Sequence, residues 1–186
     1  MKHLIPAIAL AIATASPAFS APLKLEPASP QPSGLKQGLS VLYAYPNDVK
    51  ALAQTKRHKK HAKPGKPLAG LDYIDTKDGD KTLTSKQAHH VIAWISGYVK
   101  FDKAGVYDVD FLSNDGLLAT VGGQEVAYFD GRHPCEPSRK VEVEVPSAGW
   151  YELEATYFQR LGTACLHMRS GIGGVDWMEN SSFGYK

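Results

Sequence analysis

After its first 21 residues, the sequence lacks any apolar run long enough to cross a membrane. A spanning helix needs about 20 consecutive apolar residues, and every later apolar stretch is shorter. Internal repeats are also absent, which excludes solenoids and other repeat architectures. What remains is a chain of 186 residues with 43% hydrophobic residues, enough to build one folded domain with a proper core.

The sequence also lacks the residue groups on which enzymes depend. His89 and His90 are adjacent, so on a strand they would face opposite sides and could not form a two-histidine metal site there. Asp108 and Asp110 share one strand face and resemble a glycosidase pair, but their alternation with apolar residues predicts a solvated face. We therefore expect a non-enzymatic protein.

Only two cysteines are present, Cys135 and Cys165. An even pair in an exported chain predicts a disulfide, and the alternative is two separate thiols. The bond would close a loop of about 30 residues and stabilise the fold by about 3 to 4 kcal/mol.

The N-terminus has the three parts of a secretory signal peptide. Lys2 supplies the basic start, an apolar run follows, and Ala18 and Ser20 are the small residues that signal peptidase requires. The pattern predicts a signal peptide over residues 1–20 with cleavage after Ser20. Its alanine-rich, lightly charged character is typical of bacterial export, so we expect a secreted or periplasmic protein.

Charge is balanced overall but unevenly spread. Of the 21 Lys and Arg residues, Lys2 lies in the signal, which leaves 20 against 19 acidic residues. Residues 56–66 include His58 and His61 and carry no acid, and they hold six cations: Lys56, Arg57, Lys59, Lys60, Lys63 and Lys66. Such a segment can attract a polyanion, but its lack of an aromatic residue also fits a mobile, solvated loop that repels metal ions.

Two shorter features precede the main pattern of the domain. Residues 21–37 hold four prolines and little periodicity, which predicts a flexible lead before a folded domain at 38–186. The tripeptide Pro46-Asn47-Asp48 predicts the start of one short helix that runs through Ala53.

The rest of the chain has the sequence pattern of β-strands. Apolar and polar residues alternate in short runs that glycine-bearing turns separate, which favours an all-β antiparallel sandwich or barrel. The expected strands lie at 39–45, 89–101, 106–111, 117–121, 124–129, 141–145, 151–157 and 164–168.

An ordered set of short motifs accompanies these strands. Its members are Trp-Ile-Ser-Gly-Tyr-Val at 94–99, Ala-Gly-Val-Tyr at 104–107, Ser-Asn-Asp-Gly at 113–116, Asp-Gly-Arg-His at 130–133 and Ala-Gly-Trp-Tyr at 148–151. Over about residues 38–170 the chain resembles the PA-fourteen family, which is named after a segment of anthrax protective antigen. The resemblance implies a jelly-roll or barrel-like β-sandwich that binds glycans in some members and acts as a spacer in others.

The resemblance also implies a candidate calcium site. The turn at 113–116 is similar to a Ser-Asp-Asp-Gly turn in glycan-binding relatives, whose two carboxylates hold a calcium ion that coordinates sugar hydroxyls. Asn114 replaces the first carboxylate, which should weaken the site, and Asp115-Gly116 alternatively only makes the turn. Further candidate ligands are Asp130, Asp176 and Asn180.

The candidate sugar-binding residues are Asn114, Asp115, Arg132, His133 and Trp177. For Trp177, a stacking platform and core packing of a terminal strand are both open, and the second is favoured. The first functional hypothesis is a carbohydrate-binding module. The second is a structural or assembly protein of the cell envelope that docks a protein partner, and the third is polyanion capture by residues 56–66. No feature points to a specific nucleic acid.

Overall fold

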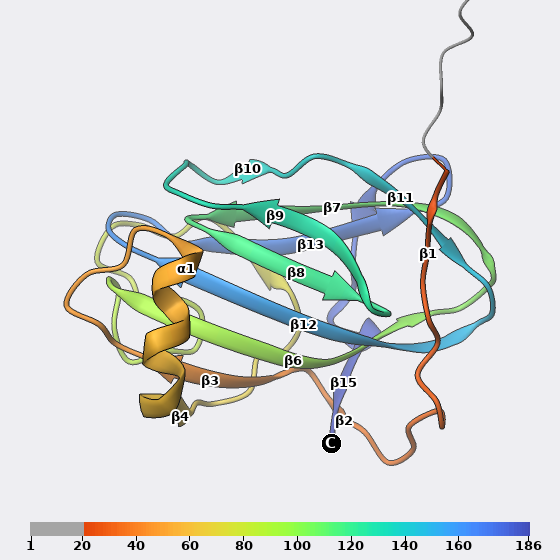
Figure 1. The fold of residues 1–186 in the computed structure, drawn as a ribbon, viewed down its shortest axis with the longest axis horizontal. Helices are drawn as coiled ribbons and strands as arrows, with labels where there is room; N and C mark the ends of the chain where they lie inside the picture. The colour runs from red at the N-terminus through yellow and green to blue at the C-terminus, as the bar shows by residue number, and fades with distance from the viewer. Residues whose placement is uncertain (1–20) are drawn as a thin grey trace, which may run out of the picture.

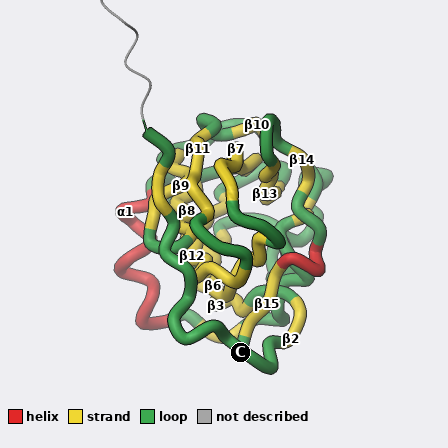
Figure 2. The backbone as a smooth tube through the Cα atoms, turned by 90° about the vertical axis from the view of Figure 1, so that its right-hand side faces the viewer, coloured by secondary structure: helices red, strands yellow, loops and turns green. Residues whose placement is uncertain are grey.

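The computed structural model describes residues 21–186, and the predicted signal peptide lies outside them. Two β-sheets pack face to face and do not join into a closed barrel (Figures 1 and 2). Of the two architectures that the strand pattern left open, the antiparallel sandwich is therefore confirmed. No helix among the described residues is long and apolar enough to cross a membrane.

The first sheet has seven strands within residues 21–186 and is centred on β7. Its path runs β1-β11-β7-β13-β14, with β10 beside β7 and β5 beside β13. Apart from the parallel pair of β1 and β11, its strands are antiparallel. The bounds are β1 Leu23–Lys24, β5 Asp72–Tyr73, β7 Gly105–Asn114, β10 Glu136–Pro137, β11 Val141–Val145, β13 Cys165–Gly171 and β14 Asp176–Trp177.

The second sheet has eight strands in the same part of the chain, and its longest members are β6 and β12. Its path runs β2-β15-β6-β12-β8-β9, while β3 pairs with both β6 and β4. The bounds are β2 Lys36–Gln37, β3 Ser40–Ala44, β4 Lys63–Pro64, β6 Val91–Phe101, β8 Leu117–Val121, β9 Gln124–Phe129, β12 Gly149–Gln159 and β15 Phe183–Tyr185. The predicted strand at 89–101 thus begins at Val91, and His89 and His90 precede it.

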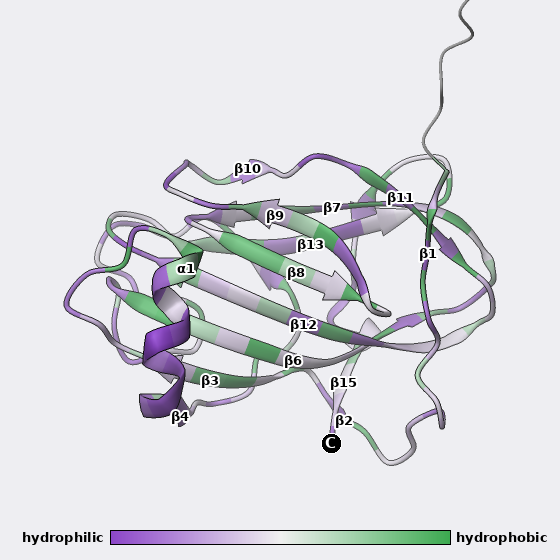
Figure 3. Ribbon diagram, in the orientation of Figure 1, coloured by the Kyte–Doolittle hydropathy of each residue, from purple (hydrophilic) through white to green (hydrophobic). Residues whose placement is uncertain are grey.

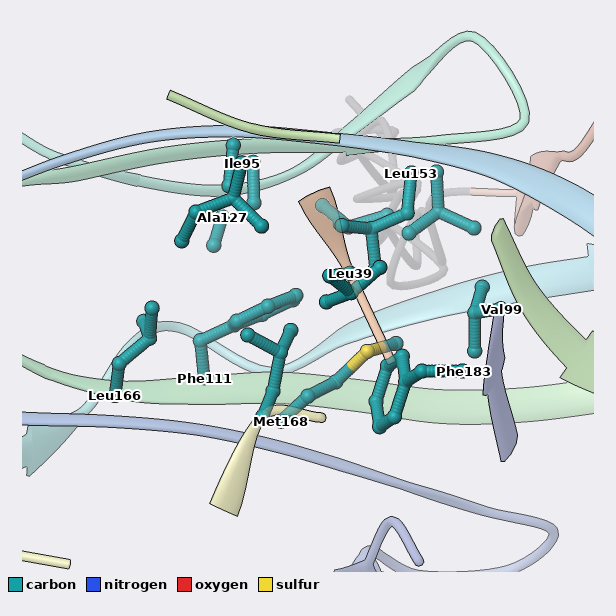
Figure 4. Close-up of a cluster of buried hydrophobic side chains, with 14 of the residues drawn as sticks. Leu39, Ile95, Val99, Phe111, Ala127, Leu153, Leu166, Met168 and Phe183 are labelled. Atoms are coloured by element: carbon teal, nitrogen blue, oxygen red, sulfur yellow. The ribbon is translucent and has the colours of Figure 1, made fainter. Parts of the chain in front are cut away.

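The core lies between the sheets and follows from the alternation in their strands. Phe111 of β7 and Leu166 and Met168 of β13 point from the first sheet towards Ile95 of β6 and Leu153 of β12 (Figure 4). All five side chains are buried. Because successive strand residues face opposite sides, the period of two in the sequence is what places one row of each strand in this core.

A second, smaller cluster lies on the outer face of the second sheet. The one α-helix among the described residues, α1 (Leu52–Thr55), is followed by the 3-10 helix η1 (Lys56–His61). Leu52 packs with Trp94 and Phe158 against this face. The predicted helix therefore exists, but it begins later than the Pro46-Asn47-Asp48 cap implied. A second 3-10 turn, η2 (Asn180–Ser182), precedes β15.

The N-terminal segment differs from the flexible lead that its prolines predicted. β1 pairs with β11, and the backbone N–H groups of Leu25 and Ala28 donate to the carbonyls of Glu144 and Trp150, each at 2.9 Å. Leu25 is 1% exposed. Prolines remove donors but tolerate extended chain, so this segment lies along the sandwich and belongs to the domain.

The basic segment also has more order than the predicted mobile loop. η1 contains four of the six cations, and the helical segment is strongly hydrophilic in Figure 3. β4 then pairs with β3 through Lys63 and Tyr43. Gly65 lies where a Cβ atom would meet the Tyr43 ring at 2.4 Å, so its backbone must approach the sheet closely. The segment is exposed on its polar side and fixed at both ends.

The carboxylates of β7 do not form a solvated face. Asp110 is 3% exposed, and both of its oxygens accept hydrogen bonds from the Arg169 guanidinium, at 2.8 and 2.6 Å. Asp108 is 8% exposed and lies 2.9 Å from the Lys140 ammonium. Arg169 comes from the neighbouring strand β13 and Lys140 from the residue just before β11, and sequence alternation alone reveals neither partner. Pairing with these cations explains how the two carboxylates can be buried.

Candidate functional site

The turn between β7 and β8 holds the motif Ser-Asn-Asp-Gly and is bonded to β12. The Asp115 N–H donates to the Phe158 carbonyl at 3.2 Å, and the Phe158 N–H donates to the Gly116 carbonyl at 2.9 Å. The peptide bond between Asn114 and Asp115 is cis. A Cβ atom at Gly116 would lie 2.1 Å from the Phe158 ring, so this position requires glycine.

Asp115 is buried at the base of this turn, at 4% exposure. Its Oδ2 accepts the Arg160 N–H at 2.8 Å, and its carbonyl oxygen accepts a hydrogen bond from His133 Nε2 at 3.0 Å. Burial raises the pKa of the Asp115 carboxyl, while hydrogen bonds from the backbone of Arg160 and of His133 and the charges of His133 and Arg132 oppose the rise. When ionised, the carboxylate is thus a single, buried negative charge held in place by hydrogen bonds.

Asn114 has an acceptor oxygen without a donor. Its Nδ2 donates to Thr163 Oγ1 at 3.2 Å, and its carbonyl accepts from the Tyr157 hydroxyl. Its Oδ1 is buried and has no hydrogen-bond partner among the described residues. A buried amide oxygen in that state costs free energy unless another group binds it, and a hard cation is one such group.

His133 and Arg132 come to the same turn from the loop between β9 and β11. His133 Nε2 lies 3.3 Å from Ser113 Oγ, and its ring contacts the Phe129 ring at a centroid distance of 3.6 Å. Arg132 is exposed. The loop is fastened by the Cys135–Cys165 disulfide, which confirms the predicted pairing.

The turn, the histidine and the disulfide therefore meet at one end of the sandwich. Cys165 lies directly opposite Asn114 in the β13–β7 ladder, and β10 pairs with β7 at Ser113. The structure brings together four of the five candidate sugar-binding residues at this end: Asn114, Asp115, Arg132 and His133.

The other predicted ligands do not join them. Asp130 Oδ1 accepts the Leu52 N–H at 2.6 Å, so this carboxylate is engaged at the start of α1. Asp176 lies on β14, which pairs with the far end of β13. Asn180 precedes β15, which pairs with the end of β6 remote from the turn. The proposed calcium ligand set of five residues therefore shrinks to Asn114 and Asp115.

Trp177 is also separate from the turn and is not a core residue. It lies opposite Arg169, four positions along β13 from Cys165, or about 13 Å. Its ring is 52% exposed, and the Arg169 guanidinium lies 5.3 Å from its centroid. Packing in the core was favoured for Trp177 on sequence, and the exposed position on β14 overturns that expectation. Trp94, by contrast, is 9% exposed and packs with Leu52 and Phe158.

Sequence reasoning missed two residues that hold the turn, Arg160 just after β12 and Asp48 between β3 and α1. The Arg160 N–H bonds Asp115, while its Nε donates to Asp48 Oδ1 at 2.9 Å. This hydrogen bond is the main reason that the pKa of Asp48 falls to about 2. Asp48 and Arg160 are more than a hundred residues apart in sequence, so no local spacing could have predicted the pair.

The basic residues occupy a different surface. Lys56, Arg57, Lys59 and Lys60 lie on η1, Lys63 on β4 and Lys66 just beyond it, and all six are exposed. Partial burial, followed by the charge of Arg57, lowers the pKa of His58. The lysines and Arg57 are therefore the permanent charges of this surface.

One group of three potential metal ligands occurs within residues 21–186. It consists of Asp75, Cys135 and Cys165, whose ligand atoms lie within 4.8 Å of one another. The two sulfurs are joined in the disulfide and are not thiolates. Calcium requires oxygen ligands, so this group does not provide its site.

Two largely antiparallel sheets packed face to face define the class of β-sandwich domains, and comparison places the fold among PA14 domains. The PA14 domain of the antifreeze protein MpAFP superposes with a TM-score of 0.67 at 13% identity, over 83% of this chain and 93% of that one. The PA14 sugar-binding domain of an RTX adhesin gives 0.61 at 18% identity, over 81% and 99%. The chain thus has the PA14-like fold that its motifs implied.

A third similar structure is a fungal adhesin with a bound sugar. The Epithelial Adhesin 9 A domain from Candida glabrata, in complex with Galb1-3GlcNAc, gives a TM-score of 0.65 at 15% identity, over 88% of this chain and 95% of that one. No protein-family profile matches the sequence. No curated protein matches it either. Identities this low define the fold and leave the function to the site itself.

Proposed function

We propose that this protein is a non-enzymatic carbohydrate-binding module whose site is the turn at 113–116 together with the loop that carries His133. The observation that carries the proposal is the meeting of Asn114, Asp115, Arg132 and His133 at one end of the sandwich. Carboxylate, guanidinium and imidazole groups can bond sugar hydroxyls in both directions. The similar adhesin domains support this function.

The residues at the turn fit a calcium ion in part. Asn114 Oδ1 is a buried oxygen without a donor, and Asp115 supplies one negative charge. Calcium takes six to eight oxygen ligands, and the remaining predicted ligands lie elsewhere or are engaged. We therefore assign a weak, millimolar site to these two residues, in which sugar hydroxyls and water complete the coordination.

A glycan array, followed by calorimetry on the selected sugar with and without calcium, tests the proposal. Asp115→Asn is the variant of choice, because its amide oxygen still accepts the Arg160 N–H while the negative charge is lost. We expect it to fold normally and to bind at least about tenfold more weakly. Glu152→Gln is the matched control, since it makes the same change on an exposed strand position. Unchanged sugar binding in Asp115→Asn would place the site elsewhere.

We also propose that the mature protein begins at Ala21 and is secreted or periplasmic. The signal-like residues 1–20 support this, as does the Cys135–Cys165 bond, because disulfides persist in oxidising compartments. Intact-mass spectrometry of the native protein is the test. A mass that still includes Met1 or Lys2 contradicts the proposal.

A further inference from the structure

The outer face of the second sheet carries an unusual row of side chains. Five residues lie in register across five neighbouring strands, β3, β6, β12, β8 and β9: Leu42, Trp94, Thr156, Leu118 and Tyr128. The row spans about 19 Å. The outer face of such a sheet is normally polar, yet four of these five residues are apolar or aromatic. Leu42 and Tyr128 are 36% and 57% exposed.

The helical segment before β4 stands beside this row and turns it into a groove. Figure 1 shows α1 crossing the outer face of β12 and β6. Beneath it lies a hollow of about 430 Å³, whose lining includes Lys56, Lys59, Leu118 and Tyr128. A second hollow of about 190 Å³ is lined by Leu42, Lys59 and Leu118. Trp94 and Lys59 line both, so the two hollows form one groove along the row.

The cations of this groove all come from the basic segment 56–66. Lys56 and Lys59 line the groove directly, and no acidic residue occurs in that segment. The lining also includes the carboxylates Asp130 and Glu154 from other elements, and Asp130 is already bonded to the Leu52 N–H. The hydroxyls of Ser96, Thr120 and Thr156 line the groove as well. A ligand that fits must be anionic along one edge only and must offer apolar patches and hydroxyls elsewhere.

We propose that this groove is a second binding site, which takes an acidic polysaccharide with sulfate or carboxylate substituents. The apolar faces of the sugar rings would lie on Leu118 and Tyr128, and the anionic substituents would face Lys56 and Lys59. The groove is independent of calcium, because its ligand is the anion and its partners are cations.

A single-stranded nucleic acid fits the same surface less well. Such a ligand needs several open aromatic faces in succession, whereas Tyr128 is exposed and Trp94 is 9% exposed. A sugar ring needs only one such platform, and Tyr128 supplies it.

Affinity measurements with heparin as the acidic polysaccharide, and dextran as the neutral control, test the site. The double variant Lys56→Gln/Lys59→Gln removes the two charges in the groove. Lys63→Gln/Lys66→Gln is the matched control, because it removes two charges from the same segment at positions that line neither hollow. We expect the first pair to weaken heparin binding at least about tenfold and the second pair about threefold or less. The first pair should also reduce the slope of log affinity against log salt by about two.

Tyr128→Ala separates a groove from a merely charged surface, because it changes no charge on an exposed edge strand. We expect it to weaken heparin binding about tenfold, because the tyrosine ring offers the apolar face on which a sugar ring lies. Asp115→Asn should leave heparin binding unchanged, which distinguishes this site from the proposed site at the turn. Equal losses in the two lysine pairs, an unaffected Tyr128→Ala, or tighter binding of oligo-dT or anionic vesicles than of heparin would each overturn the proposal.

Discussion

At the scale of single residues, Asn114 and Asp115 have different roles in the turn. Asp115 is fixed by donors on both its side chain and its carbonyl, so its charge has a defined position. Asn114 anchors through its Nδ2 and leaves its Oδ1 unpartnered among the described residues. One anchored charge beside one free acceptor oxygen attracts a divalent ion. Substitution of either residue should therefore change the affinity for calcium measurably.

Asn114→Asp is expected to strengthen calcium binding. It would add a second carboxylate at the position of the free Oδ1, and charge count is a main determinant of calcium affinity, so Kd should fall at least about tenfold. Without calcium, two buried adjacent carboxylates repel each other, and the variant should melt at a lower temperature than the parent protein. Thermal unfolding with and without calcium measures both effects.

Gln37→Glu is the control for this substitution, since it makes the same amide-to-carboxylate change at an exposed position on β2. Its melting temperature should not respond to calcium more than that of the parent protein does. A calcium response of Asn114→Asp that equals that of Gln37→Glu would show that Oδ1 does not face a cation site.

Stability should depend on pH through Asp115. Burial raises the pKa of its carboxyl in the folded protein above the ordinary value of 3.8. The folded state therefore binds this proton more tightly, so the stabilisation is complete below pH 3.8 and is lost as pH rises through the raised pKa. The free energy of unfolding of the parent protein, minus that of Asp115→Asn, should decline over that interval in urea titrations.

Calcium should reverse this trend, because only the ionised carboxylate can hold the ion. The stabilisation that calcium adds should thus increase as pH rises through the same interval. A difference between the parent protein and Asp115→Asn that is constant with pH would mean that the Asp115 pKa is not shifted on folding.

At the scale of elements, short strands at the edges matter more than their length suggests. β1 has two residues, but the chain beyond it inserts Leu25 into the core and continues its backbone bonds to Glu144, Gly122 and Trp150. Gln31 then bonds the backbone of Trp150 through both its amide nitrogen and its oxygen. The proline-rich residues 21–37 therefore form an extended segment bonded to the domain and not a flexible linker.

Leu25→Ala should destabilise the protein by about 2 to 5 kcal/mol, as expected when a buried leucine is truncated in a core that cannot close the cavity. Urea unfolding would show this as a lower midpoint with an unchanged slope. Leu161→Ala is the control, because Leu161 is 48% exposed and its truncation should cost little. Equal midpoints for Leu25→Ala and Leu161→Ala would mean that the N-terminal segment is not packed in solution.

At the scale of the whole molecule, loops from distant parts of the chain meet at one end of the sandwich. One hydrogen-bonded group contains Asp115 from the turn after β7, His133 from the loop after β9 and Arg160 from the loop after β12. The Cys135–Cys165 bond ties the second of these loops to β13. The bond thus stabilises both the fold and the geometry of the proposed sugar site.

Cys135→Ser/Cys165→Ser should lower the free energy of unfolding by about 3 to 4 kcal/mol, the cost expected for opening a loop of this length. Because the loop carries His133, sugar binding should weaken as well, whereas heparin binding in the groove should persist. Denaturant unfolding and the two binding assays give these three readouts. If loss of the bond changes neither stability nor sugar binding, the loop is held by its other contacts.

The sequence by itself determined the longer strands, the all-β antiparallel class and the disulfide. Period-two alternation is a local property, and it decides which face of each strand is buried before any partner is known, as in β8 and β11. Two cysteines leave one intramolecular pairing. The Ser-Asn-Asp-Gly motif likewise indicated the turn where the candidate sugar site lies.

Tertiary structure decided everything that depends on register between strands. The Asp110–Arg169 pair and the groove row from Leu42 to Tyr128 join residues that strand pairing places side by side. The Asp48–Arg160 pair joins two loops that the fold brings together. It also separated Asp176, Asn180 and Trp177 from the turn, which no spacing could do. The physical reason is that alternation fixes the face on which a side chain lies, while only the alignment of strands fixes its neighbours.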